Sequence, residues 1–328
     1  MPHETTPQPG APFAIGVDVG GTKIAAALVD SQGRIFGVKT RKTDVSSPDK
    51  TLESIASTVL EVMESEKVEP QDIKGVGLGI PGIVDPDRGI GVASVNLQWR
   101  NVPVVHELQN RLGIPCVIEN DVKVAALGEL KYGSGRGLKN IIYLNIGTGV
   151  AAAIILEGKI YRGQNGMAGE IGHAVVDIRG PQCKCGGRGC LEAIVSGPAI
   201  LQRVEEKIKA GTTSSLGPLF LKGHPTLKEI YQASANGDPA AMEATHEVAH
   251  YLAIAIQYLA LAYDPQRLIL GGGVVYSSPL FMDYLMRAVN QLAKESWVFR
   301  DLLTPDFIQL TSLGANIGIL GAAALVDL

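Results

Sequence analysis

The chain has 328 residues, 46% of them hydrophobic and 19% charged, and this length predicts two domains of ordinary size. Its 29 basic and 33 acidic residues give a net charge of −4, and because no basic run or stripe is present, we expect no nucleic-acid partner. The most apolar helix pattern, residues 248–263, is shorter than the roughly 20 apolar residues that cross a bilayer, so we expect no membrane partner. No secretory leader is readable either. We therefore expect a cytoplasmic protein whose cysteines are reduced.

The first predicted elements are strands that follow a polar segment. Residues 1–12 are rich in Pro and Thr, which is typical of a flexible tail. Three apolar runs then alternate with the turn Gly20-Gly21 and a turn at 30–33, and this pattern predicts an antiparallel meander. In this half the predicted strands cover residues 14–19, 24–29, 34–39, 75–80 and 116–119, and the predicted helices cover 52–63 and 122–131.

The same strand pattern returns in the middle of the chain, over residues 142–161. Aligning Asp18 with Asn145 also places Gly20 on Gly147, which indicates an internal duplication with a period too long for a solenoid. A pair of duplicated α/β domains with a cleft between them is the simplest interpretation. Downstream, the patterns predict helices over 198–210, 227–234, 239–263 and 315–326, a loop over 212–225 and a strand over 267–270.

Three glycine-rich turns after apolar strands are candidate phosphate-binding sites, because glycine lets the main chain turn tightly and present N–H groups to an anion. They are Gly20-Gly21-Thr22-Lys23, Gly147-Thr148-Gly149 and Gly271-Gly272-Gly273. Asp18, just before the first turn, could hold a hydrated Mg²⁺. Taken singly, each turn is explained equally well by an ordinary hairpin or by sheet packing. Two related turns in equivalent places favour a site for one polyphosphate.

Glu119-Asn120-Asp121 ends a predicted buried strand and begins a predicted helix. A carboxylate at this position can accept a proton from a bound hydroxyl group. The alternative is a helix N-cap, which Asn and Asp serve well, and the local sequence alone favours it. The flanking phosphate-binding turns favour Asp121 as a catalytic base.

One glycine-rich stretch gathers three of the four cysteines and a histidine, namely His173, Cys183, Cys185 and Cys190. Cys₃His is a closed tetrahedral donor set, and closed zinc sites are structural. Unconnected thiols or a disulfide are the alternatives, and a disulfide is not expected in the cytosol. Glu170 and Glu192 flank the stretch. If they are held rigidly, their carboxylates would suit hydrogen bonds from vicinal sugar hydroxyls. The alternative is that both are ordinary solvated glutamates.

Together these segments resemble the ROK family of sugar kinases and repressors, and most of all its bacterial-type glucokinases. The resemblance is carried by residues 18–23, 119–121, 144–149, 166–173 and 183–192, and it is extended by 271–273. It implies an α/β fold of duplicated actin-like ATPase (ribonuclease H-like) domains with a central cleft. The implied domains are a smaller N-terminal one, 13–121 with 312–328, and a larger one, 122–311, that carries the zinc loop.

The resemblance also implies roles for the candidate residues. The glycine-rich turns hold the phosphates of ATP, Asp121 is the base, and the His and three Cys bind zinc. The implied sugar contacts are Asn96, Asn120, Asp121, Glu170, His173 and Glu192. Family repressors carry an N-terminal helix-turn-helix domain, and residues 1–12 are too few for one, so we expect no such domain.

The expected activity is therefore transfer of the γ-phosphoryl group of ATP, with Mg²⁺, to the 6-hydroxyl of glucose, giving glucose 6-phosphate. Three alternatives stay open: a kinase for fructose, mannose or N-acetylglucosamine, polyphosphate as the donor, and a non-catalytic sugar sensor. The family resemblance further suggests a homodimer or homotetramer.

Overall fold

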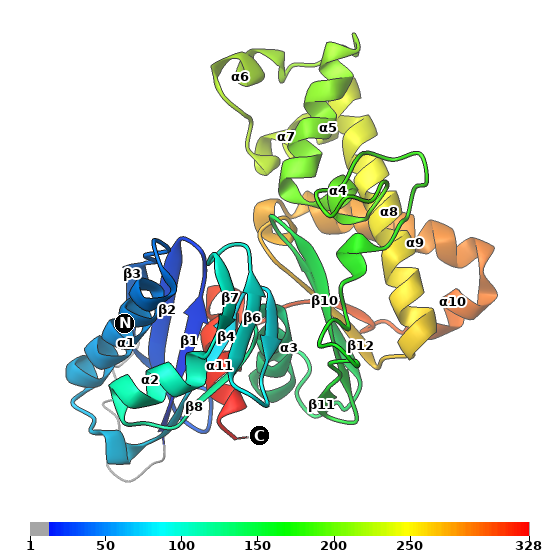
Figure 1. The fold of residues 1–328 in the computed structure, drawn as a ribbon. Coiled ribbons are helices and arrows are strands. Elements are labelled where there is room, and N and C mark those ends of the chain that lie inside the picture. Colours follow the sequence, from blue (N-terminus) through cyan, green and yellow to red (C-terminus); the bar gives the residue numbers. More distant parts are fainter. Residues whose placement is uncertain (1–12, 328) are drawn as a thin grey trace, which may run out of the picture. The chain divides into compact units, whose positions relative to one another are not determined.

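The computed structural model describes residues 13–327 (Figure 1). The predicted flexible tail, residues 1–12, lies outside these described residues. The chain divides into two compact units. Among the described residues, the first unit contains 13–139, 153–168 and 311–327, and the second contains 140–152 and 169–310. The first unit therefore extends past the predicted domain end at residue 121, because the helix that follows packs against the C-terminal helix.

The first unit is built on a five-stranded sheet with the order β3-β2-β1-β4-β8. The predicted meander is confirmed: β1 and β3 both pair antiparallel to β2, while β4 is parallel to β1 and β8 is parallel to β4. The strands are β1 (Phe13–Val19), β2 (Lys23–Val29), β3 (Ile35–Lys42), β4 (Ile73–Ile80) and β8 (Cys116–Asn120). The helices are α1 (Pro48–Glu66), α2 (Val104–Leu112), α3 (Asp121–Tyr132) and α11 (Ile317–Leu325).

The two faces of this sheet belong to two different cores. From β2, Ile24, Ala26 and Leu28 join the core that contains α1 and α2, whereas Ala25, Ala27 and Val29 join the core formed with α11. Small residues on the second face let α11 lie very close to the strands. A Cβ atom on Gly16 would lie 1.9 Å from the carbonyl oxygen of Ile319 in α11, so a larger residue would force the helix away.

A small three-stranded sheet in the first unit was not predicted. It consists of β5 (Ile83–Asp85), β6 (Ile90–Ser94) and β7 (Trp99–Val102), in that order. Strands of three to five residues carry too little alternation to be recognised in a sequence. This sheet matters for the site because the β6–β7 turn carries Asn96.

The second five-stranded sheet has the order β11-β10-β9-β12-β13, which repeats the order of the first and confirms the duplication. As in the first sheet, two parallel pairings follow the three sequential strands, here β9 with β12 and β12 with β13. The strands are β9 (Ile141–Ile146), β10 (Val150–Leu156), β11 (Lys159–Ile160), β12 (Arg267–Gly271) and β13 (Ile308–Leu310). The chain passes from the second unit into the first within β10.

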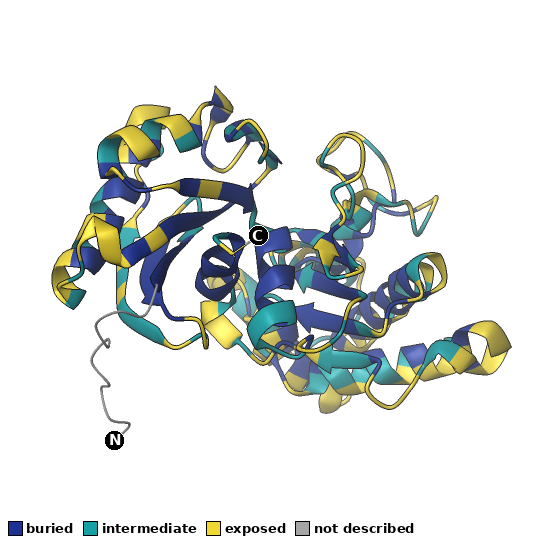
Figure 2. Cartoon of the chain, turned by 90° about the horizontal axis from the view of Figure 1, so that it is seen from below, coloured by how far each residue is buried: buried dark blue, intermediate teal, exposed yellow. Residues whose placement is uncertain are grey.

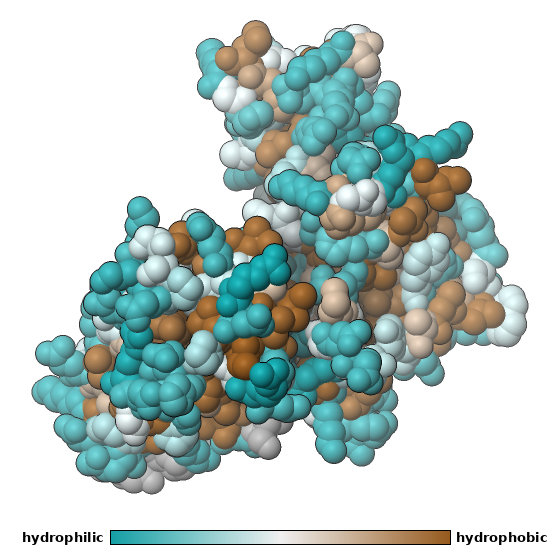
Figure 3. Space-filling model, in the orientation of Figure 1, coloured by the Kyte–Doolittle hydropathy of each residue, from teal (hydrophilic) through white to brown (hydrophobic). Residues whose placement is uncertain are grey.

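Helices make up most of the rest of the second unit. They are α4 (Glu192–Val195), α5 (Gly197–Lys209), α6 (Gly217–Lys222), α7 (Leu227–Ala235), α8 (Pro239–Tyr263), α9 (Leu280–Glu295) and α10 (Trp297–Leu302). The predicted loop over 212–225 is wrong where α6 forms. Figure 2 shows buried strands in the sheets and exposed outer helix faces. Polar side chains cover most of the surface seen in Figure 3. Among residues 13–327, no helix has the length and apolar character needed to cross a membrane.

A buried carboxylate joins α3 to the segment that leads into α11. Glu129 is fully buried, and it accepts hydrogen bonds from the backbone N–H of Ser134 (2.7 Å) and from the hydroxyl of Thr311. Burial raises the pKa of Glu129 above its ordinary value of 4.5, and these hydrogen bonds only partly oppose that shift.

This shift predicts how the pH affects stability. A carboxyl group whose pKa is higher in the folded chain binds its proton more tightly there, so its contribution to the free energy of unfolding is fully present below pH 4.5 and is lost as the pH rises through the folded-state pKa. Glu129→Gln, which carries no titrating proton, should show a smaller decline than the wild type over that pH range. Urea unfolding at a series of pH values tests this, and an equally steep decline in the variant would contradict it.

Candidate active site

Strand ends at one edge of the first sheet bring several candidate residues together. Asp18 in β1 is in register with Gly79 in β4, and Gly79 is in register with Glu119 in β8. Because neighbouring strands lie about 4.8 Å apart, the backbones of Asp18 and Glu119 are roughly 10 Å apart. Asp18 and the Asn120-Asp121 pair therefore share the edge formed by the carboxyl ends of three parallel strands, where open α/β sheets bind ligands.

Hydrogen bonds fix the orientation of Asp121 at the start of α3. Its Oδ1 accepts from the backbone N–H of Val122 (2.9 Å) and from Nδ2 of Asn120 (3.0 Å). The side chain is half-buried. A carboxylate held in this way is preorganised to accept a proton from a hydroxyl group placed beside it.

The N-cap function belongs to Asn120. Its Oδ1 accepts from the N–H groups of Val122 and Lys123, and its Nδ2 donates to the carbonyl of Gly82 (3.0 Å) as well as to Asp121. These four bonds use the whole hydrogen-bonding capacity of the amide. A sugar hydroxyl that contacts the Asn120 side chain would have to replace one of them.

The Gly20-Gly21 turn is closed by a hydrogen bond from Gly20 N–H to the Lys23 carbonyl (2.8 Å). Neither glycine has a positive φ, so the turn does not need glycine for its backbone angles. At Gly21, glycine leaves room for a neighbouring segment, because a Cβ there would lie 3.0 Å from the carbonyl oxygen of Asn96. Asn96, on the β6–β7 turn, thus lies directly against this candidate phosphate-binding turn.

Asp18 is half-buried beside the first turn of α11, where a Cβ on Gly318 would lie 2.6 Å from its carboxyl carbon. Burial raises the pKa of Asp18, and the positive charge of Lys23 partly opposes this. A single carboxylate next to a phosphate-binding turn is the donor set that a largely hydrated Mg²⁺ uses, so the residue fits that ion.

In the second unit, two glycine-rich turns lie next to each other at the ends of β9 and β12. The first of them is closed by a hydrogen bond from Gly147 N–H to the Gly149 carbonyl (2.9 Å), one residue tighter than the closure of the Gly20-Gly21 turn. Gly272 has a φ of +95°, and a Cβ there would lie 2.4 Å from the Ile146 carbonyl oxygen, so only glycine fits. The N–H of Val274 donates to the same carbonyl (3.0 Å), which holds the two turns together.

The amino-acid residues of the second unit that are candidates for sugar binding gather around the first residue of β10. Glu192, at the start of α4, accepts a hydrogen bond from the N–H of Val150 (3.0 Å). Gly172 sits against the Val150 carbonyl, where a Cβ would lie only 2.0 Å away. Gly172 belongs to the short 3₁₀ turn Ile171–His173, which directly follows Glu170. Glu170, His173 and Glu192 are therefore held close to the Gly147–Gly149 turn.

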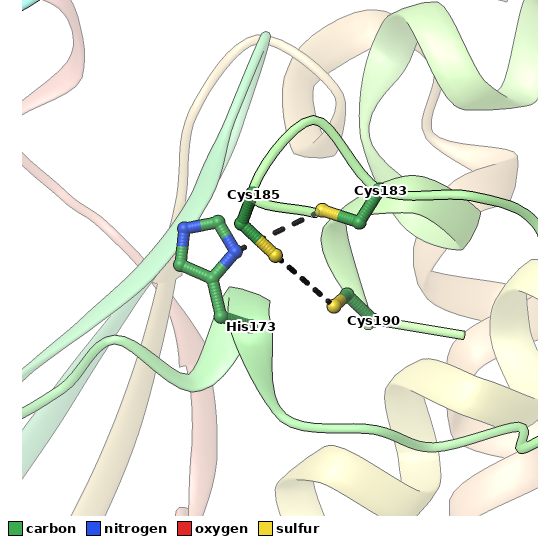
Figure 4. A group of neighbouring side chains, drawn as sticks. All are labelled: His173, Cys183, Cys185 and Cys190. Atoms are coloured by element: carbon green, nitrogen blue, oxygen red, sulfur yellow. Dashed lines mark hydrogen bonds between the residues drawn. The ribbon is translucent and has the colours of Figure 1, made fainter. Parts of the chain in front are cut away.

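The four predicted metal ligands form a compact cluster in the same unit. Their ligand atoms all lie within 4.8 Å of one another, and Figure 4 shows the side chains pointing toward a common centre. The Sγ atoms of Cys185 and Cys190 are 3.7 Å apart, close to the roughly 3.8 Å edge of a tetrahedron with zinc–sulfur bonds of about 2.3 Å. Nδ1 of His173 lies 3.9 Å from Sγ of Cys183. All four cysteines are free thiols.

The loop geometry suits a metal ion. The N–H of Gly187 donates to the Cys185 sulfur (3.4 Å), and this bond and those with the neighbouring thiols lower the pKa of Cys185 to about 7. Gly189 has a φ of +74°, and a Cβ there would lie 1.6 Å from the Asp177 carbonyl oxygen, so the loop requires glycine. Three thiol sulfurs and an imidazole nitrogen gathered in a prefolded loop fit a soft divalent metal. The Cys₃His cluster can thus hold a metal.

Comparison with known proteins gives consistent matches along the chain. The model of the ROK family matches residues 14–328. A glucokinase from Halalkalibacterium halodurans is 33% identical over 95% of this chain and 94% of its own length, and one from Thermotoga maritima is 34% identical over 95% and 96%. A xylose repressor from Bacillus subtilis is 28% identical over 96% of this chain and 77% of its own length.

Solved structures match equally well. A ROK hexokinase from Thermus thermophilus superposes with a TM-score of 0.79 at 29% identity, covering 95% of this chain and 97% of that one. A ROK-family glucokinase from Streptomyces griseus, in complex with glucose and AMPPNP, gives 0.76 at 31%, covering 95% and 98%. The fold is thus the duplicated actin-like ATPase fold. The chain belongs to the ROK family, and it has the fold of the family's sugar kinases.

Proposed function

We propose that this ROK-family protein is a hexose kinase that transfers the γ-phosphoryl group of ATP to the 6-hydroxyl of glucose. The observation that carries the proposal is the Asp121 carboxylate, oriented by two hydrogen bonds at the same sheet edge as Asp18 and the Gly20-Gly21 turn. Glucokinase relatives at 33–34% identity support glucose as the acceptor.

In the proposed mechanism, Asp121 accepts the proton of the 6-hydroxyl as the phosphoryl group moves. Phosphoryl transfer depends mainly on positioning and charge stabilisation, so the orientation of Asp121 matters more than an altered proton affinity. The N–H groups of the three glycine-rich turns bind the phosphates of ATP. Mg²⁺, which Asp18 would help to hold, supplies charge neutralisation on the phosphates when bound.

The sugar is proposed to be bound through its hydroxyl groups. Asn96 and Asn120 offer amide groups, and Glu170 and Glu192 offer carboxylates that accept charge-assisted hydrogen bonds. His173 is proposed to bind zinc through Nδ1, which leaves Nε2 facing away from the cysteines to donate to a hydroxyl (Figure 4). A structural Zn²⁺ held by His173 and the three cysteines would fix the start of α4 and therefore Glu192.

A sugar-binding regulator without phosphoryl transfer is the second candidate, because a xylose repressor matches 96% of this chain. That candidate predicts sugar binding with no consumption of ATP. A location in the cytoplasm stays a prediction from the sequence, and assembly into a homodimer or homotetramer stays a prediction from the family resemblance.

A coupled assay of ATP consumption tests the proposal. Glucose, fructose, mannose and N-acetylglucosamine are each offered at fixed ATP and Mg²⁺, and glucose is expected to give the highest kcat/KM. Repeating the glucose assay with polyphosphate in place of ATP tests the donor. If calorimetry shows that a sugar binds but none of the four sugars is phosphorylated, the result would support the regulator instead.

A further inference from the structure

Residues 162–168, here called the 162–168 loop, belong to the first unit and directly precede Gly169 and Glu170. The loop closes on itself, because the N–H of Ala168 donates to the carbonyl of Arg162 (3.0 Å). Two charged side chains from the β8–α3 junction contact it. These side chains flank Asn120-Asp121 in the sequence, one on each side.

The first contact is an ion pair. Glu119, which is only 1% exposed, accepts a hydrogen bond from Nε of Arg162 (2.6 Å) through Oε2. Its other oxygen accepts from the backbone N–H of Asn120 (2.9 Å). One carboxylate therefore links the 162–168 loop to the main chain of a residue that orients Asp121.

The second contact comes from the other side of Asp121. Lys123, in the first turn of α3, is 5% exposed, and its Nζ donates to the carbonyl of Gly166 (2.5 Å). Gly166 has a φ of +71°, so the backbone at the point of contact has a conformation that favours glycine. The loop is thus held at both ends to the same strand–helix junction.

Buried charges of this kind are weak evidence for stability. Removing a charge from water is unfavourable, and apolar replacements of buried ion pairs are often neutral or stabilising. Two buried charges that flank one dipeptide and contact one loop are better explained by the position that they impose on that loop.

We propose that Glu119, Lys123 and Arg162 are positioning residues for the sugar site. They hold the 162–168 loop against the junction that presents Asn120 and Asp121, and so fix the backbone that leads to Glu170. Asp121 performs the chemistry, and these three residues keep the sugar-binding segment in place before sugar arrives. This inference rests on the proposed hexose kinase activity.

Lys123→Met tests the inference. Methionine retains an unbranched apolar side chain but cannot donate to Gly166, so the loop must be ordered when sugar binds. We expect KM for glucose to rise roughly tenfold, with kcat and the KM for ATP little changed. Lys131→Met is the matched control: it removes a lysine from the same helix, one that pairs with Asp327, and should leave all three values unchanged.

Arg162 provides a second variant and a rescue. Arg162→Gln should raise the glucose KM like Lys123→Met, whereas Arg162→Lys, which keeps a positive charge for Glu119, should recover part of the loss. A merely stabilising contact would instead lower the midpoint of thermal unfolding without separating KM from kcat. Glucose KM values within twofold of the wild type in both Lys123→Met and Arg162→Gln would overturn the proposal.

Limited trypsin digestion gives a readout that does not need catalysis. The bond after Arg162 lies in the loop, and we expect it to be cut faster in Lys123→Met than in the wild type or in Lys131→Met. Equal cutting rates would contradict the tether. If the wild type phosphorylates no hexose, the proposed function fails, while this digestion still decides whether Lys123 holds the loop.

Discussion

Asp121→Asn is expected to lower kcat for glucose phosphorylation roughly 100-fold or more, the scale of losing a general base. The amide oxygen can still accept from the N–H of Val122, so the start of α3 should keep its structure. Because the amide cannot accept the proton of the 6-hydroxyl, transfer slows while binding of glucose persists. Steady-state kinetics and calorimetric glucose titration measure the two effects separately.

The control for Asp121→Asn is Asp49→Asn. Asp49 also lies in the first turn of a helix, α1, and pairs on the surface with Arg111. That variant should keep wild-type kinetics, since an exposed pair contributes little. Near-wild-type kcat in Asp121→Asn would remove Asp121 from the role of base and leave it as a structural residue at the start of α3.

Cys185→Ser is expected to lower the zinc content of the purified protein from one ion per chain to near zero. Loss of a thiolate ligand should weaken metal binding by more than the roughly 10- to 100-fold that follows loss of an outer-shell partner. Without the ion, the segment from Cys190 to Glu192 loses its anchor, and KM for glucose should rise. Elemental analysis and sugar kinetics on the same preparation test both statements.

Cys116→Ser makes the matched comparison. Cys116 is buried in the first unit, far in sequence from the cluster, and burial raises the pKa of its thiol to about 12, so it stays protonated. This variant should keep its zinc and its glucose KM. A wild-type protein without zinc, or a Cys185→Ser variant that retains both zinc and KM, would count against a structural metal site.

Elements with strong local signals were predicted well from the sequence. The helix over 239–263 has the predicted bounds, because Asp238 caps its first turn, Pro239 fits the first helical position and Asp264 ends it with a φ of 43°. The repeated strand–glycine–strand pattern predicted the duplicated sheets for the same reason: each turn and each apolar run is a local feature.

Short elements and contacts between distant segments were missed. Helix α6 has six residues and begins at Gly217-Pro218, a dipeptide typical of loops. The strands around Asn96 are too short to recognise, so only the family resemblance pointed to that residue. Lys123 and Glu129 are charged positions in an otherwise apolar stretch of α3, a signal that marks them as unusual. Their partners, Gly166 and Thr311, lie far away in the sequence.

Transfer to glucose is best tested by following the phosphoryl group itself. The wild-type protein is incubated with glucose, Mg²⁺ and ATP labelled at the γ-phosphoryl group, and the products are separated. We expect the label to appear in glucose 6-phosphate, and we expect Asp121→Asn to form this product at least roughly 100-fold more slowly. Label that stays in ATP, or that appears only as inorganic phosphate, would contradict this expectation.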